Sequence, residues 1–389
     1  MNSPTARVVA VAFALACVLP VAARAQPAGQ GTGPKKADAA GSGVTFGLVL
    51  DGGFSSDDLA LGERERGFGL GHTELTASGN IDDRFLGRAT AALHAHDGAV
   101  EVELEEAFVE TLTLPAGLTA RGGRFLSQIG YLNEQHPHAD DFVTRPLLYR
   151  AFLGSHYYDD GLRLNWTAPT ALYWRVGVEL LGGRQLVPEA VRSRTLGAVS
   201  LSTKLGGDIG PSQSWQLGLG VLHNRLEPIV EEEAAGALEA EHDHAHGSSY
   251  VGRNLFIADA VWKWAPEGNN RERQVRLSAE YARVTKPSAF ATSDDFHEAW
   301  YVSAVYRFAP QWEAGLRYGQ LSVREPHDDH FHDGRLREVA AMIAWKRSHF
   351  SVLRLQFTTQ SNAAGFPDAG KAVMLQYVMS LGGHGAHSY

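Results

Sequence analysis

The sequence predicts an all-β protein, a transmembrane antiparallel β-barrel of about sixteen strands with long extracellular loops and short periplasmic turns. Segments in which apolar and polar residues alternate recur from Val44 almost to the C-terminus, as in strands with one face toward lipid. The connections between these segments alternate between short and long. The chain contains 42 glycines, and no apolar run after its first 25 residues is long enough for a membrane-spanning helix.

The first 25 residues have the pattern of a secretory signal peptide. Arg7 precedes an apolar run over 8–22, and Ala23-Arg24-Ala25 has the small-x-small pattern of a cleavage site. The run is shorter than the ~20 apolar residues of a spanning helix, which favours a cleaved signal over a membrane anchor. A lipoprotein cut before Cys17 is the other alternative. We therefore expect export, with the bacterial outer membrane as the destination.

Composition bounds the rest of the chain. Residues 26–42 are expected to form a flexible periplasmic linker, since they are rich in Gly, Ala, Pro and Lys without periodicity, and residues 43–389 to form the barrel. Cys17 is the only cysteine, so a mature chain has neither a disulfide nor a cysteine metal site. Loss of Arg7 and Arg24 changes the formal charge from -9 to -11. Such a chain attracts cations, and nucleic acid is not an expected partner.

The strands follow from a period of two. In the first, Val44, Phe46, Leu48 and Leu50 alternate with more polar residues. The even number of predicted strands suits a closed bacterial barrel. The predicted ranges are 43–53, 68–80, 84–96, 99–113, 117–126, 159–167, 171–183, 196–205, 213–225, 253–264, 272–285, 297–308, 312–324, 334–346, 349–360 and 371–382.

The connections give the barrel an orientation. If the first strand runs outward, every second connection is periplasmic, and these are all short. The outer connections are mostly long: 55–67, 127–158, 184–195, 226–252, 286–296, 325–333 and 361–370, with the turn Asp97-Gly98 as the exception. All eight tryptophans except Trp300 lie near the short connections, where indole rings meet lipid headgroups. A soluble β-sandwich or propeller, the alternative, would not sort them in this way.

Strand parity predicts a polar lumen. The inward set includes Arg84, Arg88, Thr90, Arg121, Arg163, Arg175, Glu179, Arg276, Glu280, Glu313, Arg317, Arg354 and Gln356. Mixed charges suit a water-filled passage for small hydrophilic solutes better than a fatty-acid channel, although they could also serve only to pair with one another. The connection over 127–158 is long enough to fold inward and narrow the passage.

Histidine-rich runs in the outer connections predict metal ligands. Imidazoles alternate with carboxylates in these runs, and both groups bind Zn, Ni or Cu. A solvated polar loop is the simpler reading, and a flexible loop binds loosely because it must be ordered to chelate. The candidate ligands are His136, His138, His242, His244, His246, His327, His330 and His332.

A more rigid candidate adjoins the turn Asp97-Gly98. If this turn pairs His96 with Ala99, His94 stands opposite Glu101, and an imidazole and a carboxylate ~5 Å apart can share one metal ion. The candidate ligands here are His94, His96 and Glu101, all facing the lumen. His72 and Glu74 lie on the same inner wall. A pH-sensitive hydrogen-bonded pair is the alternative.

An acidic strand motif, Leu104-Glu105-Glu106-Ala107-Phe108-Val109-Glu110, is followed by a basic, glycine-flanked one, Arg121-Gly122-Gly123-Arg124-Phe125. This pair resembles that of phosphate-selective-porin-like barrels. The final strand, Leu375-Gln376-Tyr377-Val378-Met379-Ser380-Leu381-Gly382, with His384 and His387, is similar to an outer-membrane family often labelled zinc-regulated. The resemblance covers most of the barrel and implies a porin-like channel associated with zinc or related metals. Unlike TonB-dependent receptors, the chain has no room for a plug domain before Val44.

These patterns together predict a non-enzymatic, porin-like channel in the outer membrane that passes small hydrophilic solutes and is associated with acquisition of divalent metal. No cofactor is obligatory, and zinc is the candidate ion. The expected partners are outer-membrane lipids and the solutes or metal ions themselves, and a homotrimer is one assembly the sequence allows. The alternatives are an outer-membrane barrel hydrolase, for which no nucleophile stands out, and a non-conducting surface protein for metal binding or adhesion.

Overall fold

The computed structural model describes residues 43–96, 99–187, 196–226, 248–327, 330–366 and 368–382. The predicted signal peptide and linker (1–25 and 26–42) lie outside these ranges, as do His242, His244, His246 and the turn Asp97-Gly98. Residues 42–389 form one compact unit of the chain.

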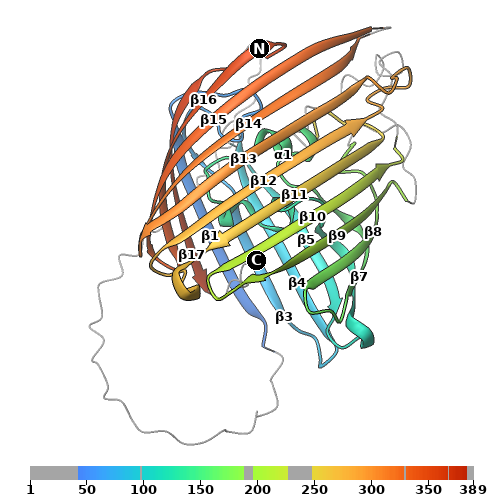
Figure 1. The fold of residues 1–389 in the computed structure, drawn as a ribbon, viewed down its shortest axis with the longest axis vertical. Helices are drawn as coiled ribbons and strands as arrows, with labels where there is room; N and C mark the ends of the chain where they lie inside the picture. The colour runs from blue at the N-terminus through green and yellow to red at the C-terminus, as the bar shows by residue number, and fades with distance from the viewer. Residues whose placement is uncertain are drawn as a thin grey trace, which may run out of the picture. The chain divides into compact units, whose positions relative to one another are not determined.

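A single antiparallel sheet of 17 strands closes on itself, because β1 pairs with β17 on one side and with β2 and β3 on the other. β2 and β3 share one place along β1, so the sheet has sixteen strand positions and the predicted barrel is confirmed (Figure 1). The strands are β1 (Thr45–Ser55), β2 (Gly67–Leu70), β3 (Thr73–Asn80), β4 (Phe85–His96), β5 (Ala99–Thr111), β6 (Leu118–Leu126), β7 (Tyr158–Thr167), β8 (Tyr173–Leu181), β9 (Ala198–Ile209), β10 (Gln213–Asn224), β11 (Asn254–Trp264), β12 (Gln274–Thr285), β13 (Phe296–Ala309), β14 (Trp312–His327), β15 (His330–Ser348), β16 (Ser351–Ala364) and β17 (Lys371–Gly382).

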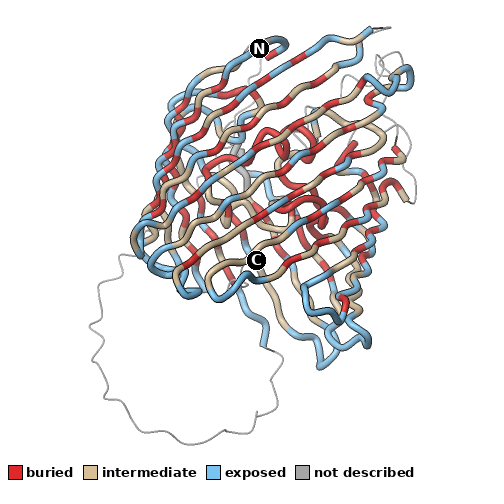
Figure 2. Tube along the Cα trace, viewed as in Figure 1, coloured by how far each residue is buried: buried red, intermediate tan, exposed pale blue. Residues whose placement is uncertain are grey.

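The two faces of the sheet differ in chemistry. Apolar side chains point outward and stay exposed, such as Phe46 at 71% and Leu162 at 62%. Charged side chains such as Arg163 and Glu179 point inward and are buried. Figure 2 shows the resulting alternation of buried and exposed positions along the strands. Among the described residues, no helix is both long and apolar enough to span a membrane.

The connections largely follow the predicted parity, with one correction. β3 and β4, and likewise β13 and β14, are joined by a few residues, whereas residues 127–157 separate β6 from β7. The expected outer loop over 325–333 is instead mostly strand: His330 and His332 belong to β15, and His332 lies opposite Glu325 of β14. Pairing satisfies the hydrogen-bonding groups of both backbones. These hydrogen bonds form even where the side chains of the strands are polar and neither face is buried.

Residues 127–157, which we call the inward segment, fold into the barrel and confirm the predicted constriction. The segment contains the 3-10 turns η2 (Leu132–Glu134) and η3 (Pro137–Ala139) and the helix α1 (Leu147–Phe152). Figure 1 shows α1 surrounded by strands. Every residue of α1 is buried. Within the described residues, two further 3-10 turns, η1 (Pro115–Gly117) and η4 (Pro266–Gly268), lie in the connections between β5 and β6 and between β11 and β12.

Polar contacts attach the inward segment to the distant strands. Glu280 of β12 accepts hydrogen bonds from the Tyr149 hydroxyl at 2.7 Å and from the Tyr131 amide at 2.9 Å. The approach requires Gly130, whose φ is 74°, because an added Cβ would lie 2.4 Å from the Tyr149 hydroxyl oxygen. On β14, Arg317 donates to the Thr144 carbonyl. The segment is therefore anchored across the lumen.

Two local irregularities affect the strands that face this segment. Gly52 pairs with Leu70 and Val49 with Glu74, so three residues (71–73) lie opposite two on β1. Such a bulge explains why the predicted strand over 68–80 is divided into β2 and β3. A second bulge occurs on β5, where Thr90 pairs with Glu106 but Ala91 pairs with Leu104. Glu105 is the extra residue.

Candidate metal centre in the lumen

Seven ionisable side chains meet where the inward segment faces β3 and β5. We call them the histidine–glutamate cluster. Its wall residues are His72, Glu74, Glu105 and Glu106, and its segment residues are His136, His138 and His156.

The β5 bulge accounts for the density of carboxylates. Along a regular strand, successive side chains point to opposite faces, so Glu105 and Glu106 could not both face the lumen. Val102 and Leu104 before the bulge and Val109 after it are exposed on the outer face. The extra residue shifts the parity between them, and both Glu105 and Glu106 are buried. The bulge thus places two neighbouring carboxylates inside the barrel.

His72 sits beside the other bulge, between β2 and β3. Its backbone N–H donates to the Asp51 carboxylate at 3.2 Å, which fixes the bulged backbone. Its Nε2 lies 3.1 Å from Glu74 Oε1 and 3.1 Å from Glu105 Oε2. The imidazole therefore bridges carboxylates from two strands that are separated by β4.

The inward segment supplies the remaining imidazoles. His136 Nδ1 lies 3.3 Å from Glu74 Oε2 and 3.7 Å from Glu105 Oε2, while its Nε2 lies 3.0 Å from Glu106 Oε2. His138 Nδ1 contacts Glu74 Oε1 at 2.9 Å. Pro137 begins the short turn that carries both histidines, so they lie side by side with ring centroids 5.8 Å apart.

His156 completes the cluster from the end of the inward segment. Its Nε2 lies 2.7 Å from Glu105 Oε1, and its ring packs edge-on against that of His72 with centroids 5.0 Å apart. Its Nδ1 is buried without a hydrogen-bond partner. The two ends of one long connection thus converge on the same wall carboxylates.

Four of these residues have the spacing of a metal site. His72, Glu74, Glu105 and His136 each offer a ligand atom, and these atoms all lie within 4.8 Å of one another. Zinc binds nitrogen and oxygen ligands at about 2.0–2.1 Å, so the ligands of a tetrahedral ion stand roughly 3.3 Å apart. His72 Nε2 and His136 Nδ1 lie 3.1 and 3.7 Å from Glu105 Oε2, on either side of that value, and they contact different oxygens of Glu74 at 3.1 and 3.3 Å. The residues fit a zinc-sized ion.

Burial makes the cluster electrostatically demanding. Glu105 is 0% exposed, and Glu74 and Glu106 are nearly so. Three carboxylates this close repel one another in a low-dielectric site and need positive charge nearby. Burial opposes a charge on His136, but attraction to Glu74 and a hydrogen bond to Glu106 hold its pKa well above the usual range. For His156, burial prevails over the attraction of Glu105 and lowers the pKa.

His136 and His138 are the predicted ligands that the structure brings into this centre. His72 and Glu74 do lie on an inner wall, as expected, but they meet Glu105 and His136. His94 is paired with Glu101 and His96 with Ala99, as the turn predicted, although the side chains of both histidines lie outside the described part. Their role as ligands stays a prediction.

The β14–β15 hairpin holds the other predicted histidines. His327 lies opposite His330, and the rings of His330 and His332 are 5.0 Å apart. Because this run is strand and not loop, the two rings share a fixed edge of the hairpin. They lie in a separate part of the sheet from the cluster.

Five cluster residues were not among the sequence-predicted ligands: His72 and Glu74, which were expected only to lie on the inner wall, and Glu105, Glu106 and His156. In the sequence, the pair Glu105-Glu106 appears only as part of an acidic strand motif. The bulge that turns both side chains inward depends on the register in which β5 pairs with β4. His156 is an isolated histidine next to the predicted start of a strand. Acidic neighbours in a strand that otherwise alternates are the one signal that could have indicated the bulge.

A cavity of about 380 Å³ lies on the far side of the inward segment, toward β11–β15. Its lining is polar and rich in basic groups: Arg145, Lys263, Arg276, Arg317 and Lys346, with Asp140 and Asp141. Most of these charges are paired, for example Arg276 with Asp141 and Lys346 with Glu313. The alternative that the lumen charges pair with one another therefore describes much of the wall of this cavity.

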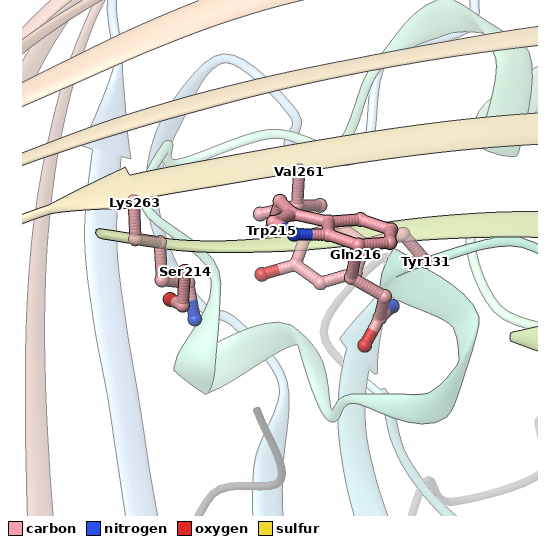
Figure 3. Close-up of a pocket in the computed structure, with 6 residues that line it drawn as sticks. All are labelled: Tyr131, Ser214, Trp215, Gln216, Val261 and Lys263. Carbon is pink, nitrogen blue, oxygen red and sulfur yellow. The ribbon is translucent and has the colours of Figure 1, made fainter. Parts of the chain in front are cut away.

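The segment packs closely beside that cavity. Figure 3 shows Tyr131 of the inward segment near Trp215 and Gln216 of β10 and Lys263 of β11. The space between them is about 10 Å³, roughly enough for one water molecule.

Comparison by sequence does not assign the chain to a family. No family model matches the chain. An uncharacterized protein of Aquifex aeolicus (strain VF5) is 26% identical over 347 residues, which cover 84% of this chain and 71% of that protein. The likeness extends over most of the barrel.

Solved structures share the fold at low identity. An anion-selective porin from Comamonas acidovorans matches with a TM-score of 0.56 and 11% identity, covering 88% of this chain and 100% of that one. The outer membrane channel DcaP of Acinetobacter baumannii matches with a TM-score of 0.54 and 11% identity, covering 90% and 99%. OmpT, an outer membrane protein of Vibrio cholerae, matches in its trimer form with a TM-score of 0.55 and 8% identity, covering 88% and 100%. The fold is that of outer-membrane barrels.

Proposed function

We propose that this chain is a porin-like channel of the bacterial outer membrane, that small hydrophilic solutes diffuse through it, and that divalent metal such as zinc binds inside it. The histidine–glutamate cluster is the observation that carries the metal part. The histidines of the outer connections extend the proposal to metal acquisition. The reading as a channel without enzymatic activity belongs to the same proposal.

The channel part is supported by the inner surface of the barrel. Ionised side chains cover it, the inward segment narrows it, and an open polar volume of about 380 Å³ remains between that segment and β11–β15. Paired charges of both signs favour hydrated solutes over apolar ones. The solved barrels named above, among them a porin and a channel, support the same reading by fold.

The metal part is supported by ligand chemistry. Imidazole nitrogen and carboxylate oxygen are ligands that zinc accepts, and cysteine is not required. Binding needs little ordering, since both bulges and the anchored inward segment hold the ligands in place.

Planar-bilayer recording tests the channel. The refolded barrel should give discrete conductance steps, both in zinc-free buffer and with zinc added. A folded barrel without any conductance would contradict the proposal, and hydrolysis of a peptide or phospholipid by the same preparation would favour the enzyme alternative. Light scattering on that preparation distinguishes a monomer from a homotrimer.

Zinc titration tests the metal part. Calorimetry with the purified barrel should show binding that is lost in His136→Ala and retained in His223→Ala, a histidine exposed on β10. A parallel titration of His330→Ala measures how much the β14–β15 hairpin contributes to zinc binding. Equal zinc affinity in all three variants would contradict a role for the cluster.

A further inference from the structure

We infer that the ion bound at the histidine–glutamate cluster is a resident ion that joins the inward segment to β3 and β5, and is not a solute in transit. This inference rests on the metal part of the proposed function and assigns its structural role. Four observations lead to it.

The ligands come from two separate parts of the molecule. His72, Glu74 and Glu105 belong to the barrel wall, whereas His136 belongs to the inward segment. An ion at this position therefore forms bonds to both. Its removal would leave the two parts connected here by imidazole–carboxylate contacts alone.

The inward segment is held differently on its other side. There, basic side chains of the wall bind acceptors of the segment: Arg276 donates to Asp141 at 2.9 Å, and Arg354 donates to the Asp140 carbonyl at 2.6 Å. Lys204 contacts Glu134 at 3.2 Å. These contacts need no ion, and they position His136 and His138 before one binds.

The far wall also supplies carboxylates, such as Glu338 of β15, which pairs with Arg150 of the segment. Toward β3 and β5 the contacts are of another kind, between imidazoles and carboxylates. The wall supplies carboxylates and the segment supplies imidazoles, as in the pairs of Glu74 with His138 and Glu105 with His156. A divalent cation would add positive charge beside three buried carboxylates that the imidazoles and Arg88 otherwise balance. The same side of the segment therefore gains most from an ion.

The cluster is also removed from the open volume. The side chains of Glu74 and Glu105 are 2% and 0% exposed, and those of His72 and His136 are 9% and 16% exposed. The cavity that could carry solutes is lined by the opposite side of the segment together with residues such as Lys263 and Ser303. An ion enclosed by four ligands away from that cavity exchanges slowly, as a structural ion does.

Hydrogen exchange followed by mass spectrometry tests this role. The barrel is compared after chelator treatment and after addition of zinc in excess over the barrel, with bound metal measured by elemental analysis once free zinc has been removed from a parallel sample. Peptides from residues 130–157 should exchange at least roughly tenfold more slowly with zinc, since a ligand well above its Kd suppresses opening in proportion to its concentration. Peptides from β10 and β11 should not change.

Variants separate this effect from nonspecific binding. His136→Ala and the isosteric Glu105→Gln should both abolish the zinc-dependent protection, and the control His223→Ala should retain it. Cobalt substitution gives a second readout: intense visible absorption bands are expected for the parent barrel and for His223→Ala only. If His136→Ala fails to fold, Glu105→Gln decides alone.

Two results would overturn the inference: a metal-free barrel after zinc addition, or stoichiometric zinc that leaves exchange in residues 130–157 unchanged. The second would indicate a transit site. Conductance is measured separately on the chelator-treated barrel, so a failure of the channel proposal is distinguished from a failure of this one.

Discussion

Glu179 illustrates how single residues hold the inward segment. Its carboxylate accepts hydrogen bonds from the Ser127 hydroxyl at 2.5 Å, from the Gln128 amide at 2.9 Å and from Arg163 Nε at 2.8 Å. It is fully buried on β8. The Glu179 side chain therefore fixes the residues at which β6 ends and the inward segment begins.

Glu179→Ala is expected to lower the free energy of unfolding by about 3–5 kcal/mol, because Arg163 would remain buried without its partner. Asp160→Ala is the matched control. Asp160 is 65% exposed in its pair with Arg124, so its loss should cost about 0–1 kcal/mol. Urea titration of the refolded barrel in detergent measures both, and equal midpoints would contradict the prediction.

At the scale of elements, the bulge on β5 has the largest effect on the site. Val102 and Leu104 face outward before it, Phe108 is buried after it, and Glu105 is the extra residue that shifts the inward–outward alternation. Removing Glu105 would give a regular strand, and all the remaining residues of β5 would still point to the same side of the sheet as before. The strand pattern therefore predicts that the barrel still folds when Glu105 is deleted.

Deletion of Glu105 should leave a folded barrel with at least about tenfold weaker zinc binding. One ligand is lost, and the bulge that places two neighbouring carboxylates at the site is lost with it. Deletion of Ala107 is the contrasting variant, because it inverts the faces of the residues on one side of it. Heat-modifiable migration on gels reports folding, and calorimetry reports affinity. Misfolding of both variants would show that the bulge is needed for the barrel itself.

At the scale of the whole molecule, the outward face should meet lipid. Leu219 lies in the middle of β10 and is 61% exposed. An arginine at the bilayer midplane costs about 2–4 kcal/mol, whereas near the interface the cost falls to about 0–1 kcal/mol.

Leu219→Arg should therefore reduce folding stability in lipid vesicles by about 2–4 kcal/mol, and Leu112→Arg, next to a short connection, by about 0–1 kcal/mol. Equilibrium unfolding followed by tryptophan fluorescence measures the difference. Similar losses at both positions would argue against a lipid-facing exterior.

The inward segment should also limit conductance. Replacing residues 130–154 by a short glycine-serine linker is expected to raise the single-channel conductance several-fold, because the segment and its buried α1 occupy the lumen. Shortening residues 286–295, which connect β12 and β13, is the control and should leave conductance unchanged. An unaltered conductance in the first variant would place the passage elsewhere.

Much of this molecule could be predicted from local pattern. Alternation predicted sixteen strand positions, the length of residues 127–158 predicted a constriction, and the spacing around Asp97-Gly98 predicted the pairing of His94 with Glu101. The hairpin at His330 was wrong as a loop because polar composition does not report backbone pairing. The metal centre was predicted only in part, through His136 and His138.

The sequence alone determined the barrel and its polar interior, because a period of two and the order of short and long connections are properties of neighbouring residues. Tertiary structure decided the candidate centre. Glu105 and Glu106 face inward together only because β5 is bulged against β4, and His156 reaches Glu105 only because the inward segment folds back. A register shift and a contact between distant residues depend on partners that no local pattern contains.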